Sequence, residues 1–283
     1  MQTTVPAEHV AARVPVAGMA KVNGIKISYK VEGIGLPLVM IAGINTNKGS
    51  WKPQTRVFKK YYCVITFDNR GAGQSDKPEG PYTIKMMADD TIGLMDHLNI
   101  QSADILGYSM GGMIAQELAI NHPERVRKLV LASTWARMGE TSGRSDELAR
   151  AMQEFEKSSH DVASRRRFAS AFLDLAINKR SNRVFYLPIL KALIRIAPVS
   201  MLGSDGQADA AGAHDAADRL NMIKAPTLVT CGTEDRLIKP SSSYLIASLV
   251  PNAKLVKVPG GGHSFASEMS GEFNRVVLDF LRN

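Results

Sequence analysis

One serine stands among glycines in the stretch LGYSMGGMIAQ, residues 106–116. Ser109 lies between Gly107 and Gly111, directly after an apolar run and directly before a helical pattern. A Gly-x-Ser-x-Gly segment in this context can hold the serine on a strained strand-to-helix turn, where its hydroxyl can act as a nucleophile. An ordinary glycine-rich turn has the same composition, so the choice depends on which other groups the chain supplies.

A nucleophilic Ser109 needs a base, because a serine hydroxyl is hardly ionised near neutral pH, and that base needs an orienting group. His263 follows the apolar run KLVKV and the turn at residues 259–262. The other five histidines fall in the N-terminal tail, on helical patterns, beside a helix stop or in a helical insertion, where surface or capping roles are expected. His263 is therefore the candidate base.

Two carboxylates compete for the orienting role. The apolar run PTLVTC is followed by Glu234 and Asp235, whereas the segment after KLVLA offers no acid until Glu140. A buried carboxylate would hold the imidazole in one tautomer and stabilise the imidazolium as it forms. We choose Asp235 and keep Glu234 as its competitor.

Attack on a carbonyl creates an oxyanion, which requires hydrogen-bond donors. The backbone N–H of Met110 follows Ser109 at a helix N-terminus, whose dipole favours negative charge. The second donor is expected in the loop after LPLVMIA, at the backbone N–H of Ile44. The Asn45 side chain could add a bond there or could cap the loop.

The elements that must position these groups are visible as apolar runs separated by helical periodicity. Strands and helices alternate with short connections, which predicts βαβ units and a mostly parallel sheet. Functional groups in such sheets sit at the carboxyl ends of the strands, where Ser109 falls. Strands are expected at residues 25–31, 36–42, 62–67, 104–107, 128–132, 226–231 and 254–258, and helices at 84–98, 110–120, 241–249 and 272–281.

The alternation of strands and helices stops between residues 133 and 222, where the pattern is helical. We expect an α/β core at 21–132 and 223–283, a flexible N-terminal extension at 1–20, and a helical cap at 133–222 that acts as a lid. Apolar side chains of the cap could line a pocket or pack onto the core, and together they favour a substrate with a sizeable apolar part. The pocket candidates are Trp135, Met138, Phe168, Phe172 and Tyr186.

Composition excludes several other classes. The chain has 283 residues and a net charge of +8, but its charges are scattered, so no nucleic-acid partner is expected. The longest apolar run, LPLVMIAGI, is far too short for a membrane span, and no signal peptide is expected.

Cys63 and Cys231 lie in β-like runs and are expected as buried free thiols, which favours a reducing, cytoplasmic location. No Cys/His cluster has metal-ligand spacing, so no metal or other cofactor is expected; the expected state is a monomer or homodimer.

Taken together, the blocks GINTNKGSW, FDNRGAGQSD, GYSMGGMIAQELAINHPERVRKLVLAS, GTEDRLIKP and GGGHSFASEMSGEFNRVVLDFL resemble the α/β-hydrolase superfamily. The order Ser, Asp, His along the chain is that of its triads. The resemblance is to the esterase and 3-oxoadipate enol-lactonase-like branch, which includes aclacinomycin methylesterase-like proteins. It implies the α/β-hydrolase fold and a serine hydrolase that cleaves a carboxylic ester or lactone through an acyl-enzyme. The chain departs from many relatives in having Ala42 where they have a histidine, which removes a side chain that can brace the oxyanion loop.

Other functional interpretations of the same residues are compatible with the sequence. With peroxide as acceptor the triad would give a cofactor-free perhydrolase or haloperoxidase, and with a vinylogous diketone it would hydrolyse a carbon–carbon bond. A reading of another class is a ligand-binding protein of the same fold without turnover. The run Asp68-Asn69-Arg70 is interpreted as a charge-paired turn that supports the neighbouring loops rather than as part of the chemistry.

Overall fold

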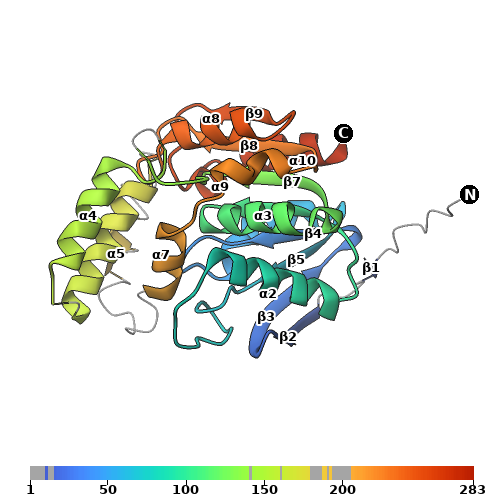
Figure 1. Cartoon of the computed structure of the whole chain (residues 1–283), viewed down its shortest axis with the longest axis horizontal. Coiled ribbons are helices and arrows are strands. Elements are labelled where there is room, and N and C mark those ends of the chain that lie inside the picture. The colour runs from blue at the N-terminus through green and yellow to red at the C-terminus, as the bar shows by residue number, and fades with distance from the viewer. Residues whose placement is uncertain are drawn as a thin grey trace, which may run out of the picture.

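A sheet of nine strands forms the centre of the part of the chain that the structure describes (Figure 1). The spatial order is β2-β3-β5-β4-β6-β7-β8-β9, and the short β1 pairs with β4. The strands β5, β4, β6, β7, β8 and β9 run parallel to one another, whereas the pairs β2–β3, β3–β5 and β1–β4 are antiparallel. The computed structural model describes residues 10–11, 16–139, 142–159, 161–178, 187–189, 191–192 and 205–283. The strands are β1 (Val10–Ala11), β2 (Val16–Val22), β3 (Ile25–Glu32), β4 (Ile34–Ile41), β5 (Tyr62–Phe67), β6 (Ala103–Tyr108), β7 (Val126–Ala132), β8 (Thr227–Gly232) and β9 (Lys254–Val258).

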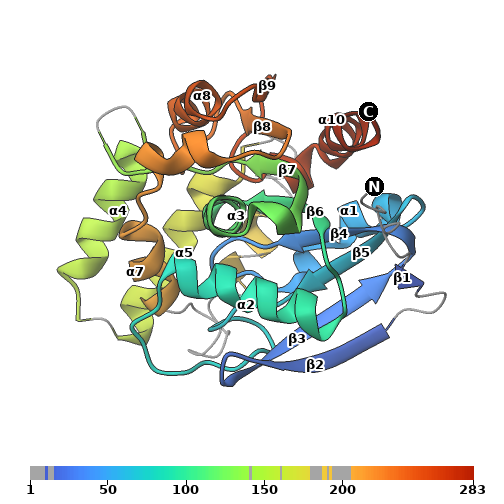
Figure 2. The ribbon, with the colours of Figure 1, turned by 45° about the vertical axis from the view of Figure 1, so that its right-hand side comes forward.

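The central strands are apolar along their length because helices cover both faces of the sheet. All six residues of β5 are buried, and so are the last five of β4. The helices α2, α3 and α8 contribute to the core on one face, and α1 and α10 to the core on the other (Figure 2). The short α9 also contributes to the second core. The helical elements are η1 (Lys48–Trp51), α1 (Lys52–Phe58), α2 (Ile84–His97), α3 (Met110–Asn121), η2 (Pro123–Arg125), α4 (Asp146–Glu156), α5 (Val162–Ala176), α7 (Asp205–Gly212), η4 (Ala217–Met222), α8 (Pro240–Leu249), α9 (Phe265–Glu268) and α10 (Ser270–Arg282).

The seven predicted strands and four predicted helices are confirmed as β3 to β9 and α2, α3, α8 and α10. The predicted boundary between the N-terminal extension and the core, at residue 20, was wrong. Residues 16–20, expected in the flexible extension, belong to β2, which pairs along its whole length with β3. Only Ala20 and Val22 of this edge strand are buried, so its sequence carries little of the alternation that marks a half-buried strand.

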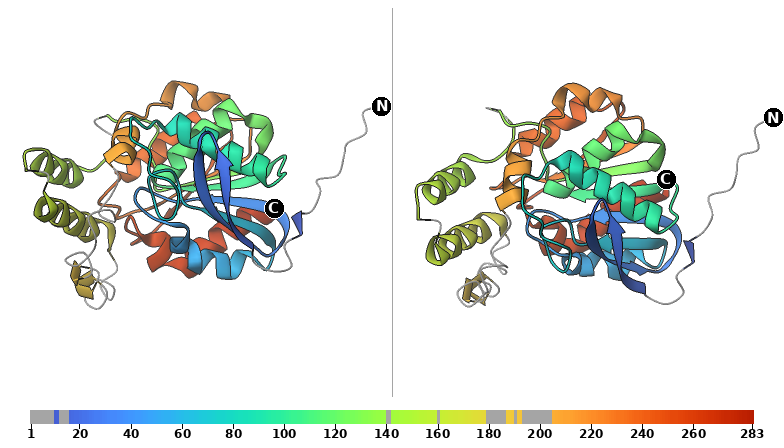
Figure 3. Two further views of the ribbon diagram at one scale, coloured as in Figure 1. Left: turned by 90° about the horizontal axis from the view of Figure 1, so that it is seen from below. Right: turned by 60° about the horizontal axis from the view of Figure 1, so that its bottom comes forward.

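Helices α4, α5 and α7 occupy the interval between β7 and β8, as the sequence predicted for this segment. Side-chain caps start two of them: Ser145 accepts from the Leu148 N–H, and Asp161 accepts from the Ser164 N–H. Figure 3 shows α4 and α5 side by side at one end of the molecule. The ion pair between Glu147 of α4 and Arg236, 3.1 Å long, joins them to the loop after β8.

Both cysteines, Cys63 and Cys231, are buried free thiols, as predicted. Burial raises the pKa of each thiol. Within the described ranges, no helix combines the length and the apolar character that a membrane crossing requires.

Candidate active site

Ser109 sits on a strained turn between β6 and α3. Its backbone has φ 56° and ψ −123°, a left-handed conformation that is unusual for any residue other than glycine. Two hydrogen bonds hold the turn: the Ser109 N–H donates to the Ala132 carbonyl at 2.9 Å, and the Gly112 N–H donates to the Ser109 carbonyl at 2.8 Å. The strain is therefore maintained by the strand on one side and the helix on the other, which is the geometry of a nucleophile elbow.

The flanking glycines are required by close backbone contacts. A Cβ added to Gly107 would lie 2.3 Å from the Gly111 carbonyl oxygen, and one added to Gly111 would lie 2.1 Å from the Ile41 carbonyl oxygen. Both distances are far below van der Waals contact. The glycine spacing in the motif thus lets α3 start directly against β6 and β4.

A continuous chain of hydrogen bonds joins the three residues that the sequence singled out. His263 Nε2 lies 3.1 Å from Ser109 Oγ, and His263 Nδ1 lies 2.8 Å from Asp235 Oδ2. All three side chains belong to residues that are at most 7% exposed. They follow β6, β8 and β9, so the parallel sheet brings together groups that are 126 and 28 residues apart in the chain.

The second oxygen of Asp235 is also bound. Oδ1 accepts from the backbone N–H groups of Leu237 and Ile238, both at 2.9 Å. The carboxylate is therefore fixed with Oδ2 toward the imidazole, where it can accept only from a protonated Nδ1. Its competitor Glu234 is exposed and instead accepts from the Asn178 side chain.

The loop after β4 packs against Ser109. A Cβ on Gly43 would lie 3.2 Å from the Ser109 Cβ, so the backbone that leads to Ile44 runs beside the candidate nucleophile. In the described part of the chain, neither the Ile44 N–H nor the Met110 N–H donates to another backbone carbonyl outside the regular elements. Neither N–H is taken up by such a bond, and the role of both as oxyanion donors stays a prediction.

The comparisons with known proteins agree with this geometry. The family model for the alpha/beta hydrolase fold matches residues 37–268. This chain belongs to the alpha/beta hydrolase family.

Three proteins illustrate where this alpha/beta hydrolase lies within the family. A protein of Azorhizobium caulinodans, provisionally named carbamate hydrolase RutD, is 27% identical over 258 residues, 89% of this chain and 93% of that protein. The crystal structure of the enol-lactonase from Burkholderia xenovorans LB400 is 29% identical with a TM-score of 0.80, over 94% of this chain and all of that one. Est816, described as an N-acyl homoserine lactone degrading enzyme, is 31% identical with a TM-score of 0.78, over 93% and 100% of the two chains. The expected similarity to enol-lactonases is confirmed.

Two side chains brace the loop after β4: Asn69, in the turn that the sequence predicted to support the neighbouring loops, and Gln207, which sequence reasoning missed. Asn69 Nδ2 donates to the Ala42 carbonyl at 3.1 Å. Gln207, on α7 and fully buried, accepts from the Asn45 N–H at 2.8 Å and donates to the Arg70 carbonyl at 2.6 Å. They connect the loops after β4 and β5 and so support the backbone at Ala42 and Asn45.

A third residue outside the prediction is Tyr108, inside the glycine–serine motif. Its hydroxyl donates to the backbone carbonyl of His263, and its ring packs between Trp51 and His263. Burial raises the pKa of the Tyr108 phenol well above its usual value, so the hydroxyl stays protonated and remains a donor. The contact fixes the backbone of the candidate base.

The predicted pocket residues fall into two groups. Trp135 is buried in the core beneath α3, and its carbonyl accepts from Gln116 Nε2 at 3.0 Å. Met138, Phe168 and Phe172 are half-buried and pack against the same core, and Phe168 also stacks on Phe155 of α4. Tyr186 lies outside the described residues. Packing is therefore a demonstrated role of four of the five candidates.

The expected charge pairing at Asp68-Asn69-Arg70 is confirmed. Arg70 makes a two-bond ion pair with Asp90 of α2, with Nε–Oδ2 2.6 Å and Nη2–Oδ1 2.8 Å. Asp68 pairs with Lys48 at 2.8 Å. Both pairs join loops at the carboxyl edge of the sheet to neighbouring elements.

Proposed function

We propose that this hydrolase cleaves a carboxylic ester or lactone through an acyl-enzyme, with Ser109 as nucleophile, His263 as base and acid, and Asp235 as orienting group. The observation that carries the proposal is the unbroken sequence of contacts from Asp235 Oδ2 through the imidazole to Ser109 Oγ, on a serine whose backbone is held at positive φ. A solely structural turn needs neither the strain nor the chain of hydrogen bonds.

In the first step Ser109 Oγ attacks the substrate carbonyl carbon while His263 Nε2 accepts the hydroxyl proton. The resulting imidazolium keeps its Nδ1–H on Asp235, whose carboxylate stabilises the positive charge. The N–H groups of Ile44 and Met110 bind the oxyanion, and each such donor is worth about 2.7–4 kcal/mol in the transition state. The imidazolium then protonates the leaving alcohol, which leaves the acyl group on Ser109.

Deacylation repeats these steps with water. His263 Nε2 accepts a proton from the water that attacks the acyl carbon, and the same N–H groups bind the second oxyanion. The imidazolium returns its proton to Ser109 Oγ as the carboxylic acid leaves. With a lactone, alcohol and acid belong to one molecule and the ring is opened.

We also propose that residues 133–222 act as a cap over this site and favour a substrate with an apolar part. Phe168 and Phe172 are half-buried aromatic side chains of α5, and the C-terminal end of this helix contacts the loop of His263. Ala176, at the end of α5, accepts from the N–H of Ser264, the residue after the candidate base. The cap is thus in direct hydrogen-bond contact with that loop.

Labelling with a fluorophosphonate tests the proposal. We expect one adduct on Ser109 by intact mass and peptide mapping, with turnover of p-nitrophenyl esters from acetate to decanoate. Ser109→Ala should abolish the adduct and lower turnover at least about 10³-fold. The matched control is Ser133→Ala, because Ser133 is also buried and at positive φ, but its Oγ has no hydrogen-bond partner in the described part of the chain. An adduct that persists in Ser109→Ala, or equal losses in both variants, contradicts the assignment.

A carbamate is the second candidate substrate, favoured by the name of the Azorhizobium relative. The same residues would attack a carbamate carbonyl and expel ammonia or an alcohol. Parallel assays for ammonia release from a carbamate, ring opening of an N-acyl homoserine lactone and hydrolysis of an enol-lactone separate the candidates by kcat/KM.

A further inference from the structure

A second concave site lies on the face of the sheet that α1 covers, apart from Ser109, Asp235 and His263. This cleft has a volume of about 620 Å³. Lys30 and Glu32 of β3 and Thr66 of β5 contribute to its lining, together with η1, α1 and the Gly73–Gln74 turn. None of the three candidate catalytic residues lines it.

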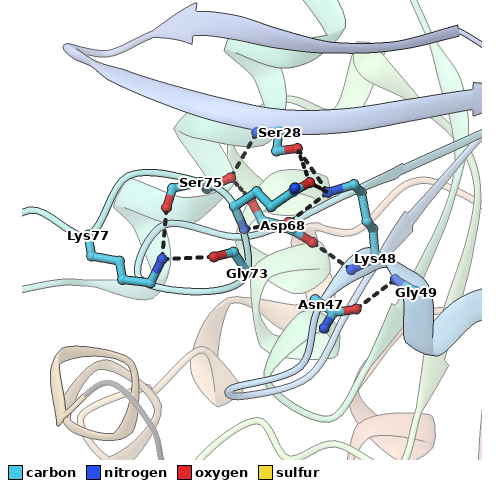
Figure 4. Close-up of polar contacts among 9 residues, drawn as sticks. Ser28, Asn47, Lys48, Gly49, Asp68, Gly73, Ser75 and Lys77 are labelled. Carbon is cyan, nitrogen blue, oxygen red and sulfur yellow. Dashed lines mark hydrogen bonds and ion pairs between the residues drawn. The ribbon is translucent and has the colours of Figure 1, made fainter. Parts of the chain in front are cut away.

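Lys48 fixes one wall of the cleft (Figure 4). Its Nζ donates to Asp68 Oδ2, to Ser28 Oγ and to Gln74 Oε1, at 2.8, 2.8 and 2.9 Å. Its backbone N–H donates to Asp68 Oδ1 at 2.6 Å. All three ammonium protons are used, so Lys48 and Asp68 neutralise each other and form a structural part of the wall.

The remaining charged side chains leave the cleft positive. Lys30 and Lys59 share one carboxylate, Glu32, at 2.9 and 3.4 Å. Lys52 and Arg56 are exposed, and neither makes an ion pair with a carboxylate in the described part of the chain. Five cations, with Lys48 included, against two carboxylates give the lining a net charge of +3.

The cations of α1 are presented by a fixed scaffold. Lys52 and Arg56 of α1 and Lys59 at its C-cap are spaced four and three residues apart, which places them on one side of the helix and its end. The opposite side is anchored: Phe58 is fully buried, and Gln54 Nε2 donates to the Ala266 carbonyl at 2.6 Å. The positive charges therefore converge on the cleft without the ordering cost of a mobile segment.

We propose that this cleft binds a small organic molecule that carries two or more phosphate or carboxylate groups. Its volume is within the range of about 300–1,000 Å³ typical of small-molecule sites. An unpaired guanidinium beside a lysine offers the fork geometry that phosphate and carboxylate accept. A polymer such as RNA would instead need a basic surface that extends beyond the cleft.

Isothermal titration calorimetry on the full chain tests the proposal, with inorganic pyrophosphate and citrate as probes for the two kinds of group. The variant Lys52→Gln/Arg56→Gln removes two of the three excess charges. The matched control, Lys224→Gln/Lys254→Gln, removes the same charge at exposed lysines far along the sheet, before β8 and at the start of β9. Thermal unfolding of both variants checks that folding is intact.

We expect one probe or both to bind with 1:1 stoichiometry and a Kd below about 1 mM. The cleft variant should bind at least about tenfold more weakly, and the control should bind as the original chain does. The preferred probe identifies phosphate or carboxylate as the recognised group. No saturable binding of either probe, or an equal loss in the two variants, overturns the proposal.

Discussion

Replacing Gln207 with methionine tests whether α7 holds in place the loop after β4, which carries the proposed oxyanion donor Ile44. Methionine has a similar length and volume, but it removes the acceptor of the Asn45 N–H and the donor to the Arg70 carbonyl. Leaving the carbonyl of the buried Arg70 without its partner costs about 1–3 kcal/mol, whereas water can replace the bond at the exposed Asn45, so the free energy of unfolding should fall by about 1–3 kcal/mol. A domain that is stable by about 5–15 kcal/mol survives this change.

The effect on catalysis should be distinct from the effect on stability. Asn45 follows Ile44, whose N–H is one of the two proposed oxyanion donors. Loss of one such donor costs about 10²–10³ in kcat, so partial misplacement should lower kcat by about tenfold or more while KM changes little. Steady-state hydrolysis of a p-nitrophenyl ester and urea unfolding measure the two effects on the same protein.

Asn274→Leu is the matched control for Gln207→Met. Asn274 of α10 is also a buried amide that donates to a backbone carbonyl of another element, Pro53 of α1, at 3.3 Å, but its partner does not belong to the loop after β4. It should lose stability and keep kcat. If Gln207→Met loses stability with kcat unchanged, Gln207 is only a structural contact and the reasoning about the loop is wrong.

Two further substitutions have expected outcomes that follow from the structure. Asp235→Asn places an amide against His263 Nδ1 and imposes the wrong tautomer, so kcat for ester hydrolysis should fall about 10⁴-fold; a loss of less than tenfold would argue against the triad. Asp104 is fully buried at the start of β6, and burial raises its pKa to about 6 despite the opposing effects of Arg127 and Lys128. Since the folded pKa lies above the unfolded value of about 3.9, the native state binds the extra proton, and stability should fall by about 2–3 kcal/mol as pH rises from 4 to 7. Asp104→Asn should remove that part of the pH dependence of the free energy of unfolding, which urea unfolding at each pH measures. If plots of this free energy against pH for the two proteins run parallel from pH 4 to 7, Asp104 does not titrate as described.

The sequence predicted most of the fold because the central strands are buried on both faces. Runs such as residues 36–42 and 62–67 are apolar throughout, and the glycine-containing loops after them mark the carboxyl edge. The edge strand β2 was not predicted in full because four of its seven residues are exposed and only two are buried. Helix α1, KPQTRVF, was not predicted because it is short and only three of its residues are buried.

The three candidate catalytic residues could be found from the sequence because each follows its own strand. The choice of Asp235 over Glu234 depended on burial, which the neighbouring residues did not reveal. Gln207 could not be found in this way, since its partners Asn45 and Arg70 lie more than 130 residues away in the chain. Its one signal was a long polar side chain in a stretch of small residues, GSDGQADAAGA.

The close contacts around the elbow decide where this scaffold tolerates redesign. Position 109 already holds a side chain at φ 56°, so a cysteine or aspartate there inherits the same backbone and changes only the attacking atom. Position 111 has no such freedom, because one added carbon would meet the Ile41 carbonyl and force α3 away from the sheet. Engineering toward thioester or halide chemistry should therefore exchange the nucleophile and keep both flanking glycines.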